Sequence, residues 1–171
     1  MKKIIKKHIE NLKELTTCIG GDIRAYLDSL SYDGKDPSVQ IVELTNEDSI
    51  SQLYTDNGFY IILTDHVFSD NDCGFSYNKQ VAIYRGHCYS VKNRIYSHLA
   101  NQYHNDFGKP KYKTCLKIES GVNGININEK PYSNWKWTVI IHKMRGSNKL
   151  IREQAEVAFD SLYGKPCKSR E

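Results

Sequence analysis

The chain has 171 residues, of which 39% are hydrophobic and 26% are charged, and its formal net charge at pH 7 is +4. These values fit one folded domain and exclude a disordered chain, which would lack the apolar content to form a core. The five cysteines form no Cys-x-x-Cys pair and show no zinc-ligand spacing, which argues against a disulfide framework and a structural zinc site. Because no apolar run is long enough for a membrane span or a signal peptide, we expect a soluble cytoplasmic protein without a membrane partner.

The first fifty residues are expected to form a helical N-terminal extension. Residues from about 2 to 17 carry apolar side chains at helical spacing and should form one helix that ends before Gly20-Gly21. A second short helix follows Asp22 and ends before the turn cluster at residues 32–37. Residues 39–44 could form a strand and residues 46–48 a short helix or loop. We place the boundary with a core domain, residues 51–171, near residue 50.

The core domain shows alternating strand and helix signals. Segments rich in β-branched and aromatic residues, bounded by turn residues, predict strands at residues 58–64, 80–86, 113–119 and 135–144. Ser90 and Ser147 are expected N-caps of two helices, the second closed by Gly164 and Pro166. The order of two strands, a helix, a strand and a helix indicates a fold of mixed α and β elements.

Positive charge is concentrated in the second half of the chain. Residues 1–85 hold 9 Lys and Arg against 13 Asp and Glu, a balance of −4, whereas residues 86–171 hold 15 against 7, a balance of +8. A basic half is expected for a surface that contacts a polyanion such as nucleic acid. An ordinary solvated basic surface explains the charge equally well.

A repeated pattern of Tyr and Gly marks two neighbouring strand segments. Gly58-Phe59-Tyr60 opens the first segment and Tyr84-Arg85-Gly86 ends the second, while the next helix carries Arg94 eight residues after Gly86 and His98 four residues later. This pattern resembles the GIY-YIG nucleases, in which both motifs have a central Ile that is lost here. The resemblance covers about residues 57–166. It implies an α+β fold, α/β in the broad sense, with a small antiparallel sheet flanked by helices.

The resemblance also implies roles for four side chains. Tyr60 is expected to be the general base for the attacking water and Tyr84 to orient the phosphate, although the two roles could be exchanged. Arg94 and His98 lie four residues apart on a helix, so both can reach one phosphate. An unperturbed Tyr has a pKa of about 10 and needs a nearby cation to act as a base near neutral pH. Arg94 or a metal ion could provide that charge.

A metal-binding carboxylate is expected on the last helix. Glu153 and Glu156 are both candidates, and Glu156 better fits the family pattern of a Glu followed by apolar residues and later a Pro. One carboxylate suffices for Mg²⁺ (or Mn²⁺), which takes its other ligands from water and phosphate. The alternative is an ion pair of either Glu with Lys149 or Arg152 on a solvated face. The family's Asn after the Pro is missing here.

Residues 105–134 are expected to form an inserted hairpin that contacts DNA. Lys side chains suit phosphates, and Asn side chains can bond base edges. A flexible polar hairpin is the alternative. The expected contact residues are Lys111, Lys113, Asn123, Asn126 and Asn128, and Lys79 and His87 are further candidates for approaching the scissile phosphate.

A short chain that must both read and cut DNA is most like a type II restriction endonuclease, which hydrolyses phosphodiester bonds in double-stranded DNA with a divalent metal. One active site per chain implies a homodimer whose symmetry matches a palindromic site. The alternatives are a repair or homing nuclease of the same family, an inactive nucleic-acid-binding module, or an unrelated α/β domain that matches the motif by chance.

Overall fold

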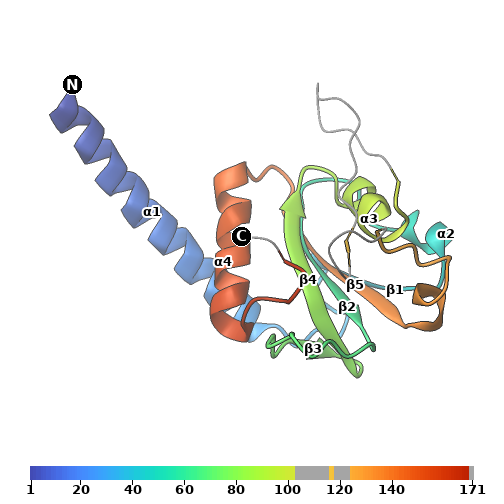
Figure 1. Ribbon diagram of the computed structural model, residues 1–171. Coiled ribbons are helices and arrows are strands. Elements are labelled where there is room, and N and C mark those ends of the chain that lie inside the picture. Colours follow the sequence, from blue (N-terminus) through green and yellow to red (C-terminus); the bar gives the residue numbers. More distant parts are fainter. Residues whose placement is uncertain (103–115, 118–123, 170–171) are drawn as a thin grey trace.

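The computed structural model describes residues 1–102, 116–117 and 124–169, and it confirms the expected α+β fold with a helical N-terminal extension (Figure 1). A curled antiparallel sheet of five strands in the order β1-β5-β2-β4-β3 forms the centre of the molecule. Helix α4 lies on one side of this sheet, and helices α2 and α3 lie on the other (Figure 1). None of the helices in the described ranges is both long and apolar enough to cross a membrane.

The strands follow the predicted segments closely. They are β1 (Val39–Leu44), β2 (Gly58–Thr64), β3 (Ser76–Tyr77), β4 (Gln80–Cys88) and β5 (Trp137–Lys143). The short strand β3 was not expected, because two residues give no detectable alternation. Strand β1 precedes the boundary expected near residue 50, yet it pairs with β5 and belongs to the same sheet. Most of the strand expected at residues 113–119 lies outside the described residues.

Helix α1 (Lys2–Ser29) is continuous, so the expected break at Gly20-Gly21 is wrong. Residues from Gly20 onward pack against helix α4, and a Cβ at Gly20 would lie 3.2 Å from Oε1 of Gln154. The small residue therefore allows a close approach of the two helices. Packing against α4 outweighs the low helix propensity of glycine, which is a weak local preference.

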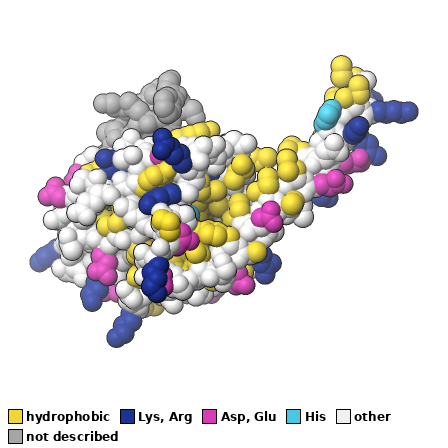
Figure 2. All heavy atoms as spheres, turned by 180° about the vertical axis from the view of Figure 1, so that it is seen from behind, with side chains coloured by type: hydrophobic (Ala, Val, Ile, Leu, Met, Phe, Trp, Pro, Cys, Tyr) yellow, Lys and Arg dark blue, Asp and Glu magenta, His cyan; other side chains and the backbone are white. Residues whose placement is uncertain are grey.

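The first half of α1 extends away from the rest of the molecule (Figures 1 and 2). Its apolar side chains are largely exposed, with Ile5 51%, Ile9 62% and Leu12 51% accessible. Figure 2 shows hydrophobic side chains running along this projecting segment toward the body. A soluble monomer rarely leaves such a continuous apolar surface without a partner.

Within the described residues, three further α-helices and the short 3-10 helix η1 (Tyr132–Asn134) complete the fold. The three α-helices are α2 (Glu47–Ile50), α3 (Val91–Leu99) and α4 (Lys149–Tyr163). Ser90 stands at the N-cap of α3 as expected, although its side chain makes no capping bond. The N-cap of α4 is Asn148 and not Ser147: Oδ1 of Asn148 accepts a hydrogen bond from the Ile151 amide at 3.0 Å, whereas the Ser147 hydroxyl donates to the Met144 carbonyl.

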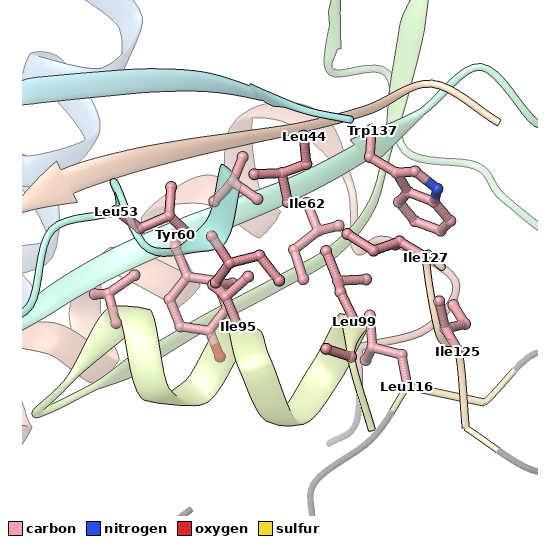
Figure 3. Close-up of a cluster of buried hydrophobic side chains, with 14 of the residues drawn as sticks. Leu44, Leu53, Tyr60, Ile62, Ile95, Leu99, Leu116, Ile125, Ile127 and Trp137 are labelled. Carbon is pink, nitrogen blue, oxygen red and sulfur yellow. The ribbon is translucent and has the colours of Figure 1, made fainter. Parts of the chain in front are cut away.

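Alternating side chains of the central strand β2 build two cores. Phe59, Ile61 and Leu63 pack toward α4 and the end of α1, whereas Tyr60 and Ile62 pack toward α3. Figure 3 shows Tyr60 inserted between the sheet and α3 among aliphatic side chains. All seven residues of β2 are buried. Burial therefore holds the side chains of β2, Tyr60 among them, in fixed positions.

Candidate active site

Strands β2 and β4 and helix α3 bring Tyr60, Tyr84 and His98 together. The Tyr60 hydroxyl oxygen and Nε2 of His98 are hydrogen-bonded at 2.8 Å. The Tyr84 ring stacks on Tyr60, with 6.1 Å between centroids, and lies 4.7 Å from the His98 ring centroid. Three residues from separate parts of the sequence pattern therefore form one contact cluster, which we name the tyrosine cluster.

Gly86 provides the space in which the tyrosine cluster forms. It is the register partner of Tyr60 in the β2–β4 pair. A Cβ at Gly86 would lie 2.7 Å from the Tyr60 hydroxyl and 2.9 Å from Cε1 of Tyr84, distances that real Cβ atoms essentially never show. The glycine of the second motif is thus required because both tyrosine rings cross the strand at this point.

The two tyrosines differ in exposure. Tyr60 is 1% exposed, and burial raises its pKa well above the ordinary value, aided by Tyr84 and Cys88 and opposed by the charge of Arg94. Tyr84 is partly exposed. Burial and the charge of Glu156 raise the Tyr84 pKa, whereas a hydrogen bond with Tyr60 and the charge of Arg94 act to lower it. Tyr84 is therefore the cluster's contact with solvent.

Arg94 lies on α3 one turn before His98 and is partly exposed. Its positive charge acts on both tyrosines and also on the His87 ring. A guanidinium near two phenols favours their ionised forms, because opposite charges stabilise each other. The charge of Arg94 therefore opposes the burial-driven rise in the pKa of both tyrosines without reversing it.

Glu156 reaches the same edge of β4 from α4. Its Oε2 accepts a hydrogen bond from Nη1 of Arg85 at 2.9 Å. Burial raises the pKa of Glu156, while the charge of Arg85 opposes that shift. Glu153, the other candidate, pairs with Lys149 at 3.3 Å. Of the two carboxylates, Glu156 lies nearer the tyrosine cluster, since its charge acts on Tyr84.

Arg85, the middle residue of the second motif, is a residue whose role sequence reasoning missed. Its Nε and Nη2 donate to the two oxygens of Asp160 at 3.0 and 2.6 Å, and its Nη1 binds Glu156. This buried network fastens α4 to β4. The available signal was the spacing of Glu156 and Asp160, four residues apart on one helix face, opposite an Arg in an otherwise apolar strand.

The donor set of Glu156 fits a singly anchored Mg²⁺. A carboxylate has about four lone-pair sites, so the bond of Glu156 to Arg85 leaves sites for a metal. Mg²⁺ commonly takes one or two protein carboxylates and fills its remaining positions with water and phosphate oxygens. Within the described ranges, no three His, Cys, Asp or Glu side chains are grouped to hold a metal ion.

The expected DNA-contact residues are only partly visible. Lys111, Lys113 and Asn123 lie outside the described residues. The Asn126 amide donates to Glu129 at 2.8 Å, and the Asn128 side chain both accepts from the Glu47 amide and donates to its carboxylate. Asn126 and Asn128 would have to exchange these bonds in order to contact bases.

Lys79 and His87 lie at opposite ends of β4. Lys79 has a φ of 64° and belongs to the turn between β3 and β4, far along the strand from Gly86. His87 follows Gly86 directly. Burial, followed by the charge of Arg152, lowers the pKa of His87 to about 4. His87 is therefore a neutral side chain beside the tyrosine cluster at neutral pH.

These side chains define the site through their geometry and their order in the sequence. No model of a known protein family matches the chain, and neither a curated protein nor a solved structure matches it. The chemistry of the site is therefore argued from its own residues.

Proposed function

We propose that the protein is a metal-dependent endonuclease that cuts double-stranded DNA at specific sequences. The observation that carries this proposal is the tyrosine cluster held over Gly86, with a cation on α3 and a carboxylate on α4 beside it. A phenol, a guanidinium and a metal-binding carboxylate are together sufficient for phosphodiester hydrolysis. A purely structural aromatic cluster would not need charged groups from two helices.

Tyr84 is the group that takes the proton of the attacking water. That role was expected for Tyr60 with an exchange left open, and the exchange is favoured because Tyr60 is buried against His98. With Nε2 of His98 protonated, it donates to the Tyr60 hydroxyl oxygen, and the single Tyr60 hydroxyl proton is given to Tyr84, which lowers the Tyr84 pKa. Tyr60 and His98 then position Tyr84, and the charge of Arg94 stabilises its phenolate form.

Arg94 also binds the scissile phosphate and stabilises the negative charge that develops on it. Glu156 holds Mg²⁺ (or Mn²⁺), which when bound supplies positive charge to the phosphate oxygens. Arg85 keeps the Glu156 carboxylate in place and ionised, because removal of the guanidinium would leave a half-buried carboxylate unpaired.

A homodimer is the proposed working form, and α1 is its proposed interface. Apolar residues follow a heptad spacing along α1 and form a surface that we name the α1 stripe: Ile5, Ile9, Leu12, Ile19, Ile23 and Tyr26. The second half of the α1 stripe already packs within the chain. An antiparallel copy of α1 centred near Leu12 brings the partner's first turn to Ile23 and Tyr26. There a cavity of about 270 Å³, lined also by Leu27 and Phe59, can receive apolar side chains.

The restriction type of nuclease is the proposed class, with base reading assigned to residues 105–134 and with the cytoplasm as the compartment. The choice rests on the Lys and Asn content of that segment. The scattered cysteines suit a reducing compartment.

A second candidate function is a nucleic-acid-binding module without catalysis. The Arg85–Glu156 ion pair favours it, because a carboxylate engaged by a buried guanidinium binds a metal less strongly. Cleavage and binding tests separate the two candidates, since the binding module would retain duplex affinity without any metal-dependent cutting.

A digest of mixed plasmid DNA with Mg²⁺, followed by sequencing of the ends, tests the proposed function. We expect discrete fragments with a shared end sequence. EDTA should abolish cutting and leave the circular dichroism spectrum unchanged, because one carboxylate is not a folding metal site. Intact plasmid at every metal tested would contradict the proposal.

A further inference from the structure

Arg152 is a buried cation without a counter-charge. It lies in the first turns of α4 and is 0% exposed. Its Nη1 donates to the carbonyl and hydroxyl oxygens of Ser147. Its Nε and Nη2 are buried and find no acceptor in the described part of the chain, which also offers it no carboxylate within ion-pair distance. An isolated buried charge is strongly unfavourable, so a folded chain that keeps one calls for an explanation.

Two side chains at the end of β4 surround the Arg152 guanidinium. The Tyr89 ring covers it, with 4.1 Å between Cζ of Arg152 and the ring centroid, and Tyr89 is itself 47% exposed. His87 lies close enough for the Arg152 charge to depress its pKa, and its Nδ1 is also buried without a partner among the described residues. The Tyr89 ring therefore covers the Arg152 guanidinium, and both Arg152 and His87 carry buried nitrogens without a partner among the described residues.

This arrangement adjoins the tyrosine cluster. Arg152 and Glu156 lie four residues apart on α4 and so share a helix face. On the facing strand, His87 directly follows Gly86. The charge of Arg94 also acts on His87. The positive charges of Arg94 and Arg152 therefore both act on the His87 ring, next to the proposed scissile phosphate.

We infer that Arg152 and His87 form a second anion site, which binds the backbone phosphate next to the scissile one, with Tyr89 as a movable cover. This inference rests on the proposed nuclease function. The guanidinium presents its N–H groups in a planar fork that matches two phosphate oxygens, and a phosphate would provide the missing counter-charge. Tyr89 can leave the guanidinium because half of its ring is already in solvent.

The test compares DNA binding at several salt concentrations, with Ca²⁺ in place of Mg²⁺ and a labelled duplex as the probe. Arg152→Gln should weaken binding to every duplex about tenfold and reduce the salt slope by about one, as expected for one lost phosphate contact. Arg152→Lys should keep the slope, because it keeps the charge. Arg145→Gln is the control, since Arg145 is a nearby exposed arginine paired with Asp56.

A second readout keeps the inference testable if Arg152→Gln does not fold. Inorganic phosphate should raise the melting temperature of the parent protein, and Tyr89→Ala should give the same rise at a lower phosphate concentration. An unchanged affinity and salt slope in Arg152→Gln, or an unchanged phosphate response in Tyr89→Ala, would overturn the inference. If Arg152→Gln loses the phosphate-induced rise in melting temperature but binds DNA as the parent does, the site binds free phosphate and the DNA assignment is overturned. If the parent protein does not cleave DNA but Arg152→Gln still reduces the salt slope, the proposed nuclease function is wrong and the anion site stands.

Discussion

At the scale of single residues, the central feature is the close packing of the Tyr60 and Tyr84 rings over Gly86. Replacing Gly86 with Ala should displace both tyrosine rings and cost about 1–3 kcal/mol of stability, in the range of overpacked sites. Cleavage should fall more than this loss of stability explains, because the displaced rings belong to the site. Thermal unfolding and single-turnover cleavage measure the two effects. Gly21→Ala is the control, since no atom lies within 4 Å of the added Cβ.

The two tyrosines predict different outcomes when their hydroxyls are removed. Tyr84→Phe should lower the cleavage rate roughly a hundredfold, on the scale of general base catalysis. Tyr60→Phe should lower it less, because Tyr60 acts through Tyr84 and His98. The pH dependence of cleavage measures the distinction: removal of a base abolishes the rise in rate with pH, whereas removal of a positioning residue only shifts it. The opposite order of effects would return the base role to Tyr60.

At the scale of elements, local patterns predicted the strands well. Their β-branched and aromatic residues, bounded by turn residues, placed β1, β2, β4 and β5. Burial does not alternate along the central strands, since all seven residues of β2 and six of the seven residues of β5 are buried. The continuity of α1 could not be predicted, since the contact of Gly20 with α4 is a tertiary effect. The same holds for the partners of Arg85, which lie more than 70 residues away. The order of Tyr60, Tyr84, Arg94 and His98 was readable, but the burial of Tyr60 was not.

Helix α1 predicts how two copies associate. The double variant Ile9→Glu with Leu12→Glu places charges on the α1 stripe and should convert a dimer into a monomer of 19.7 kDa. Light scattering after size-exclusion chromatography measures the mass. Thr17→Glu, on the opposite side of the helix, should leave the dimer intact. A monomeric parent protein would refute α1 as a dimer interface, and vesicle binding by that monomer would assign the stripe to a membrane surface instead.

At the scale of the whole molecule, buried histidines predict the effect of acid on stability. Burial lowers the pKa of His142 to about 4, against about 6.5 in an unfolded chain. Between these values the unfolded state binds more protons, so stability is full above pH 6.5 and falls as the pH drops toward 4. The loss has a limit of roughly 3 kcal/mol for this group. His142→Gln should show a smaller drop in melting temperature between pH 7 and 4.5, and an equal drop would contradict this account.

Single-turnover cleavage by Arg94→Ala, beside its binding of the same duplex in Ca²⁺, tests the central claim most directly. In the proposed mechanism Arg94 stabilises charge that develops only during the reaction, so cleavage should fall roughly a hundredfold or more while specific binding persists. Glu156→Gln should lower the cleavage rate as much as Arg94→Ala does, whereas Glu153→Gln should not, because only Glu156 lies beside the tyrosine cluster. Cleavage by Arg94→Ala at the parent's rate would contradict the assignment of this site as the nuclease centre.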